Sequence, residues 1–202
     1  MKKRVLNKIR KNLIKQYSDY NSDKIDVIMY GVEALYITLE KSIIIFFLSF
    51  IFGIFKELIL LLIFFNIIRM FAFGMHAPTG FICLIMSSVI FLLSAYLLKI
   101  LTIPKSIIPC IYMAFIIIEF LFAPADTAKR PIVKKKKRKI FKLLSILVII
   151  TYFIISIIIS NKVIINAMLL SILIECLLIL PLTYKIFKLP YNNYKNFDSN
   201  IN

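Results

Sequence analysis

A histidine and a cysteine stand seven residues apart in the segment 69–83, Arg-Met-Phe-Ala-Phe-Gly-Met-His-Ala-Pro-Thr-Gly-Phe-Ile-Cys. His76 is the only histidine among the 202 residues. A cysteine thiol becomes a strong nucleophile when a neighbouring imidazole takes its proton. The pair of His76 and Cys83 therefore indicates cysteine-dependent acyl transfer. A structural histidine at a helix end and an inert cysteine in an apolar run are the alternative, and these residues alone leave it open.

The residues between the pair predict a break between two helices. In one unbroken helix, seven residues would separate His76 from Cys83 by about 10.5 Å along the axis, too far for a thiol–imidazole contact. Pro78 disfavours helix at the residue before it, and the glycines at 74 and 80 permit tight backbone turns. Thr79 then caps the next helix, which puts Cys83 near the positive end of the helix dipole. From such a break, His76 can fold back toward the thiol.

The composition predicts an integral membrane protein. Hydrophobic residues make up 61% of the chain and the mean hydropathy is +0.91, whereas globular domains have about 45–50% apolar residues. We expect an all-α, polytopic membrane helical bundle with about six apolar segments, at 25–55, 58–73, 79–98, 106–122, 143–160 and 163–182. A re-entrant pair at 42–73 fits as well as two full spans, because both runs there are shorter than the roughly 20 residues a bilayer requires.

The ends of the chain differ from this apolar middle. Residues 5–17 carry apolar side chains at helical spacing with Lys and Arg between them, which predicts a helix on the membrane surface; a helix packed on the loops is the alternative. We expect one integral membrane domain over 1–202, made of an amphipathic interfacial helix (1–24), membrane helices (25–182) and a frayed cytoplasmic tail (183–202).

Positive charge is concentrated in two segments. The chain has 26 Lys and Arg against 10 Asp and Glu, for a net charge of +16, and most basic residues lie before residue 25 or between 129 and 142. The positive-inside rule puts both termini, the 123–142 loop and the break at His76 on the cytoplasmic side. Because the charges flank apolar spans, the pattern does not indicate a nucleic-acid partner. The run 134–139 suits either an acidic peptide or anionic lipid.

The remaining reactive residues are few. Three cysteines, all in apolar runs, make a disulfide framework improbable. One histidine and no cysteine cluster cannot supply a four-ligand metal site, so we expect no metal and no cofactor.

Two motifs of this chain resemble the accessory gene regulator B family of quorum-sensing membrane peptidases. The first is Arg69…Gly74-Met-His76-Ala…Cys83, and the second is Ala-Pro-Ala-Asp-Thr-Ala-Lys-Arg-Pro at 123–131, similar to the family's Ala-Pro-x-Asp-Thr…Lys-Pro loop. Length, charge and expected topology agree over nearly the whole chain. One departure is Phe73, where the family commonly has a second glycine before the histidine.

The resemblance implies a membrane cysteine endopeptidase of the bacterial cell membrane, with His76 as general base and Cys83 as nucleophile. Its substrate would be a signal propeptide with an amphipathic leader, a central cysteine and an acidic C-terminal tail. The tail is removed as Cys83 forms a thioester, from which the signal peptide cyclises to a thiolactone. The expected supporting residues are Arg69, Gly74, Asp126, Lys129 and Arg130; Asp126 or Asn66 would orient His76. We expect a homodimer.

Two other functions remain compatible with the residues. A small transporter or peptide exporter would use the intramembrane acids Glu119 and Glu175 for coupling. A non-enzymatic scaffold would use neither acid nor thiol.

Overall fold

The structure, a computed structural model, describes residues 2–16, 22–75, 79–127 and 131–195. In these residues it contains eight helices and no β-strand, apart from one isolated backbone bridge between Phe73 and Ala125. The expected all-α membrane bundle is confirmed. The chain divides into two compact units, 1–48 and 49–202, each described by itself below. The expected division into functional regions stays a prediction.

The first unit contains helix α1 (Lys2–Gln16) and most of helix α2 (Ser22–Ile51). The two helices are joined by an ion pair in which Arg10 Nη2 lies 2.5 Å from Asp26 Oδ1, with both side chains exposed. The helix expected at 5–17 is therefore present. Its location on the membrane surface stays a prediction.

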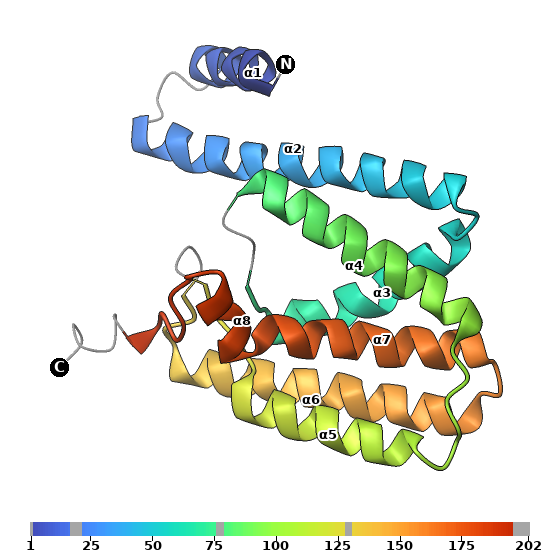
Figure 1. Ribbon diagram of the computed structural model, residues 1–202. Helices are drawn as coiled ribbons and strands as arrows, with labels where there is room; N and C mark the ends of the chain where they lie inside the picture. The colour runs from blue at the N-terminus through green and yellow to red at the C-terminus, as the bar shows by residue number, and fades with distance from the viewer. Residues whose placement is uncertain (1, 17–21, 76–78, 128–130, 196–202) are drawn as a thin grey trace. The chain divides into compact units, whose positions relative to one another are not determined.

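The second unit is a bundle built around helix α7 (Lys162–Ile179) (Figure 1). Helix α7 packs against α3 (Phe55–Ala72), α4 (Gly80–Ile100), α5 (Ile108–Phe122) and α6 (Lys135–Ile158). A short helix α8 (Pro181–Ile186) follows. Of the 18 residues of α7, 67% are buried, against 11% of the most apolar 18-residue stretch of α4. Helix α7 is therefore the central helix of this unit.

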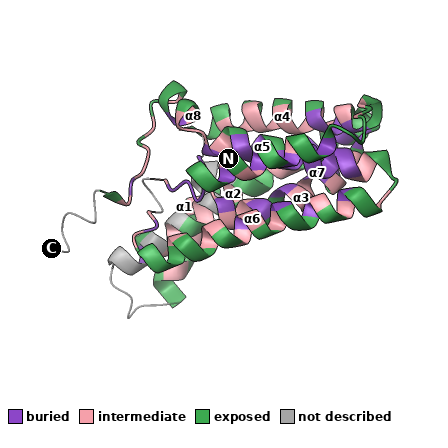
Figure 2. Cartoon of the chain, turned by 90° about the horizontal axis from the view of Figure 1, so that it is seen from below, coloured by how far each residue is buried: buried purple, intermediate pink, exposed green. Residues whose placement is uncertain are grey.

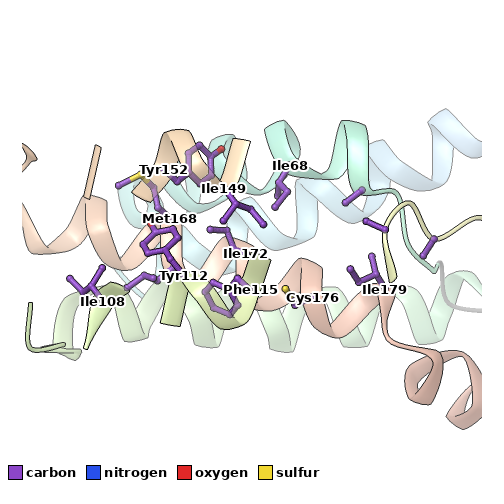
Figure 3. Close-up of a cluster of buried hydrophobic side chains, with 14 of the residues drawn as sticks. Ile68, Ile108, Tyr112, Phe115, Ile149, Tyr152, Met168, Ile172, Cys176 and Ile179 are labelled. Atoms are coloured by element: carbon purple, nitrogen blue, oxygen red, sulfur yellow. The ribbon is translucent and has the colours of Figure 1, made fainter. Parts of the chain in front are cut away.

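The core beneath α7 joins four helices (Figure 3). Ile172 of α7, Ile68 of α3 and Ile149 of α6 are all fully buried. Tyr112 of α5 is 1% exposed, and its hydroxyl lies 2.7 Å from Ser156 Oγ of α6. The phenol therefore satisfies its polar atom inside the bundle, as a buried tyrosine must.

The helices also have exposed faces (Figure 2), and many of the exposed side chains are large and apolar. On α4 an exposed stripe at helical spacing comprises Phe81, Ile85, Val89 and Leu93. Such a continuous apolar face suits hydrocarbon and not water. Within the described residues, four helices are long and apolar enough to cross a membrane: the 31–51 part of α2, α4, α6 and α7. Helix α5 is apolar but has only 15 residues.

Two expected boundaries were wrong. Residues 56–57, expected as a turn, lie in the first turn of α3, and the chain reverses at 52–54, where Gly53 has a φ of +63°. The 123–142 loop ends early, because α6 begins at Lys135 and takes in most of the basic run. Lysine and arginine are good helix formers, and nothing after Pro131 stops the helix.

The expectation of a frayed tail at 183–202 was also wrong for the part that the structure describes, up to residue 195. Residues 181–186 form α8, and Tyr184 and Asn193 are only 1% and 4% exposed. These polar side chains are buried because they bind the loop that follows α5, as shown below.

Candidate active site

The predicted helix break is present between α3 and α4. Helix α3 ends at Ala72 and α4 begins at Gly80. The Thr79 side chain caps α4, with its Oγ1 accepting from the Ile82 backbone N–H at 3.3 Å. The thiol-bearing helix therefore starts where the sequence predicts, and residues 73–75 leave α3 in a different direction.

Both residues that follow α3 have left-handed backbone conformations. Phe73 has a φ of +64° and Gly74 a φ of +102°. A side chain at positive φ is unfavourable by roughly 1–2 kcal/mol. This explains why a glycine suits position 73 in the family that the motif resembles. In this chain the Phe73 ring packs edge-on against Phe141 of α6, with 5.1 Å between centroids.

The segment after α3 is paired with the loop after α5. The Gly74 N–H donates to Ala125 O at 2.8 Å, and the Ala125 N–H donates to Ala72 O at 2.9 Å. The Met75 N–H donates to Leu178 O of α7 at 3.1 Å. The two motif segments, 69–83 and 123–131, thus meet at one end of the bundle although about 50 residues separate them.

Arg69 holds the same segment from inside the bundle. Its Nη2 donates to Gly74 O at 3.1 Å and to Met75 O at 2.8 Å. Its Nη1 lies 3.2 Å from both carboxylate oxygens of Glu175 on α7. The Arg69 side chain is 16% exposed and that of Glu175 is fully buried. Each charge is therefore neutralised by the other in an apolar setting.

Gly74 has no room for a side chain. A Cβ at this position would overlap Arg69 Nη1 and lie 3.1 Å from Leu178 O. The absence of a side chain lets the guanidinium lie directly against the backbone, in addition to permitting the positive φ.

Asp126 is a structural anchor for two other segments. Its carboxylate is 1% exposed and accepts from the backbone N–H groups of Ile132 (3.3 Å), Asn193 (3.0 Å) and Tyr194 (2.9 Å). Arg138 Nη1 of α6 lies 3.8 Å away. Three backbone N–H groups and a nearby cation therefore satisfy a carboxylate that is shielded from water.

The C-terminal segment closes over Asp126 with aromatic side chains. The Tyr184 hydroxyl donates to Asp126 O at 3.1 Å, and its ring packs edge-on against Tyr191. Burial raises the pKa of the Tyr184 phenol above its ordinary value, so the hydroxyl keeps the proton that it donates. The Arg138 guanidinium lies 3.5 Å from the centroid of the Tyr194 ring.

Cys83 is the fourth residue of α4 and is half-buried. Its backbone N–H donates to Thr79 O at 3.0 Å, and its Sγ lies 4.0 Å from Ser87 Oγ. Of the other two cysteines, Cys110 is exposed and Cys176 is buried in the core. Cys83 alone of the three lies in the first turns of the helix that follows the break after α3.

Three of the expected site residues, His76, Lys129 and Arg130, lie outside the described residues. Their distances to Cys83 and Asp126 therefore stay predictions. Asn66, the other residue expected to orient the histidine, donates to Leu62 O of its own helix at 2.7 Å. Among the described residues no group of three His, Cys, Asp or Glu is placed to hold a metal ion.

The sequence reasoning missed two features of the site. Glu175 was expected as a possible coupling residue of a transporter, and its ion pair with Arg69 was not predicted. The signal was present, since a lone Arg and a lone Glu inside apolar helices must neutralise each other or face water. Asn193 and Tyr194 carried no signal, because they bind Asp126 mainly through their backbone N–H groups.

The fold and the site define a polytopic membrane protein with a half-buried thiol beside a helix break that a buried Arg–Glu pair holds in place. The family model described as accessory gene regulator B matches residues 3–179. The chain therefore belongs to the accessory gene regulator B family, whose name places it in quorum sensing.

Similar proteins support this membership. The chain is 35% identical over 171 residues to a putative AgrB-like protein of Clostridium acetobutylicum, covering 85% of this chain and 82% of that one. It is 33% identical over 199 residues to accessory gene regulator protein B of Staphylococcus epidermidis, covering 94% and 100%. A putative AgrB-like protein of Listeria innocua is 25% identical over 171 residues, covering 85% and 84%. No solved structure matches the chain.

Proposed function

We propose that this protein is a membrane cysteine endopeptidase that removes the C-terminal tail of a quorum-sensing propeptide and promotes cyclisation of the remaining signal peptide. The observation that carries the proposal is the position of Cys83. It is a half-buried thiol in the first turns of α4, directly after the break that contains the only histidine. The family match extends over both residues of the pair.

Cleavage begins with proton transfer from Cys83 Sγ to the His76 imidazole. The thiolate attacks the carbonyl carbon at the end of the signal segment, which forms an S–C bond. The peptide C–N bond then breaks, and the tail leaves as an amine that takes the proton from His76. The signal segment is left as a thioester on Cys83.

Cyclisation follows from the same intermediate. The cysteine of the propeptide attacks the thioester carbonyl, and its proton returns to Cys83 through His76. One thioester replaces another, so the exchange is nearly neutral in energy and requires no nucleotide. It competes with hydrolysis, which an apolar, water-poor site suppresses.

The acidic tail of the propeptide is the expected partner of the basic start of α6. Lys135, Lys136 and Lys137 are exposed in the first turn of this helix. The same end of the bundle carries the break after α3, because Gly74 binds Ala125 in the loop that leads to α6. Opposite charge raises the local concentration of the tail near the thiol.

The direct test compares Cys83→Ser and His76→Ala with the unaltered protein in membranes. The substrate is a tagged propeptide with one central cysteine and an acidic C-terminal tail. Both variants should reach normal levels in the membrane but lose tail removal by roughly 1,000-fold or more, as loss of a nucleophile or its base does. Immunoblotting of the tag measures cleavage.

Cys110→Ser is the matched control, because it makes the same substitution at an exposed thiol on another helix. It should cleave at the rate of the unaltered protein. Normal cleavage by Cys83→Ser or His76→Ala would exclude the cysteine-peptidase function.

A further inference from the structure

Glu175 has a position that the cleavage chemistry alone does not explain. Its carboxylate is fully buried on the central helix α7, and both of its oxygens accept from a single nitrogen, Arg69 Nη1, at 3.2 Å. The other terminal nitrogen of Arg69 binds the carbonyls of Gly74 and Met75, the two residues that precede His76 in the chain.

The shape of the guanidinium links these two sets of contacts. The group is planar and rigid, so the direction of Nη1 fixes the direction of Nη2. A carboxylate that holds Nη1 therefore also sets where Nη2 meets the two carbonyls. Without Glu175, the guanidinium would rotate or leave the apolar interior to find water.

Helix α7 contacts the same segment a second time. Leu178 lies three residues after Glu175 and accepts from the Met75 N–H at 3.1 Å. The segment after α3 is thus held both by the α7 backbone and by Arg69. The absence of a Cβ at Gly74 lets both contacts form, since a Cβ there would meet Arg69 Nη1 and Leu178 O.

We infer that Glu175 is a positioning residue for the peptidase reaction, acting through Arg69 to fix the segment from which His76 follows. The inference rests on the proposed function. Its consequence is that α7, which carries neither member of the catalytic pair, sets the approach of the imidazole to Cys83. An error of about 1 Å in such an approach lowers a rate on the order of 100-fold.

The first experiment separates rate from binding. Glu175→Gln keeps the size of the side chain and removes its charge. We expect kcat for tail removal to fall on the order of 100-fold with little change in KM, because the fully buried Glu175 side chain is not accessible to the substrate. Glu175→Asp, which keeps the charge, should recover part of the lost rate. A normal kcat in Glu175→Gln would overturn the inference.

Glu119→Gln is the matched control. Glu119 of α5 is also a fully buried glutamate in an apolar helix, but neither of its oxygens has a hydrogen-bond partner among the described residues. The same chemical change should leave kcat unaltered there. An equal loss of kcat in both variants would show a general effect of buried charge and would overturn the inference.

A double variant distinguishes the loss of positioning from a loss of folding. Glu175→Gln leaves the Arg69 charge buried and unpaired, which is destabilising, whereas replacing both partners with apolar residues of similar size is often tolerated. Arg69→Met with Glu175→Met should therefore insert and melt like the unaltered protein while kcat stays low. A stable double variant with normal kcat would contradict the positioning role.

The rate of Cys83 alkylation by iodoacetamide, located by mass spectrometry, provides a readout without substrate. His76→Ala should slow this alkylation near neutral pH and change its pH profile. Glu175→Gln should have the same effect, and the combination should add nothing further. Additive losses would overturn the inference.

The cleavage assays distinguish failure of the inference from failure of the proposed function. If His76→Ala and Cys83→Ser still cleave the propeptide, the proposed function itself fails. If these two variants are inactive but Glu175→Gln cleaves normally, only the role of Glu175 fails.

Discussion

Gly74 combines two constraints that usually occur at different residues. Its φ of +102° is unfavourable for any L side chain, and a Cβ there would also meet Arg69 and Leu178. The second constraint is specific to this site, because it keeps the guanidinium against the backbone before His76. The residue preceding it, Phe73, shares the positive φ, and its backbone N–H donates to Arg69 O at 3.2 Å.

We predict that Gly74→Ala lowers tail cleavage on the order of 100-fold, because Arg69 must move away from the segment it holds. The matched control is Gly53→Ala. Gly53 also has a positive φ, +63°, but a Cβ there would meet nothing within 4 Å. That variant should lose only about 1–2 kcal/mol of stability and keep its cleavage rate. Cleavage assays and thermal melts in detergent measure both, and equal activities would refute the close-contact argument.

Replacing Glu119 should stabilise the protein, in contrast to the destabilising changes at the glycines. Its buried carboxyl group has no hydrogen-bond partner among the described residues, and burying an unsatisfied polar group costs about 1–3 kcal/mol. Glu119→Leu should therefore raise the thermal melting temperature in detergent, whereas Glu175→Leu should lower it by leaving Arg69 unpaired. A lower melting temperature for Glu119→Leu would indicate a binding partner of that carboxyl group.

At the scale of the elements, the described part of the C-terminal segment is bound to the loop after α5 and is not a free tail. The backbone of residues 193–194 and the hydroxyl of Tyr184 bind Asp126. Asp126 follows Ala125, which is paired with Gly74. Contacts thus run continuously from the C-terminal segment through the loop after α5 to the break after α3.

We predict that Asp126→Asn destabilises the protein by about 1–3 kcal/mol, because an amide has one acceptor oxygen for the donors that a carboxylate satisfies with two. Limited proteolysis should then cut the segment 187–195 faster. Asp26→Asn is the control, since its ion pair with Arg10 is exposed and worth at most about 1 kcal/mol. Equal protease resistance of the two variants would rule out the anchoring role of Asp126.

Truncation tests the same contacts from the other side. Ending the chain after Leu189 removes the donors at Asn193 and Tyr194 and should lower both the melting temperature and cleavage. Ending it after Lys195 removes only residues beyond these contacts and should change neither. A loss of cleavage only in the chain that ends at Leu189 would link the C-terminal segment to the site. Normal cleavage by both truncated chains would contradict that link.

At the scale of the molecule, the second unit separates its polar contacts between two ends. One end gathers the break after α3, the loop after α5 and the C-terminal segment. At the other end, Lys99 donates to Gly53 O at 2.7 Å, and Asn166 donates to Leu101 O at 2.9 Å. Basic residues are much more frequent at the first end, which the positive-inside rule assigns to the cytoplasm.

We therefore predict that alkaline phosphatase fused at residues 102–106 is active, whereas fusions in the 128–133 segment and at the C-terminus are inactive. The enzyme folds only outside the cytoplasm, so its activity measures the side of each loop. Fusions of green fluorescent protein provide the reciprocal control, because this protein fluoresces when it folds in the cytoplasm and stays dark when it is exported unfolded. The opposite pattern would overturn the cytoplasmic location of the site.

The sequence alone determined the helix break and the helix class, and it singled out His76 and Cys83 as the candidate reactive pair. Thr79, which caps α4, and Gly74, with its positive φ, act through local backbone conformation, which neighbours in the chain decide. Apolar composition is likewise sufficient to require helices in a membrane. The boundaries of α3 and α6 were less predictable, because Lys and Glu continue a helix as readily as they occupy a loop.

Only the tertiary structure decided which segments hold the site together. Glu175 meets Arg69 across 106 residues, and Asp126 meets Asn193 across 67. These pairs depend on how α7 and the C-terminal segment pack against the rest of the bundle. Much of that binding uses backbone N–H and C=O groups, which every residue type except proline offers in full. The sequence of residues 187–194 therefore gives no sign of the partner that its backbone binds.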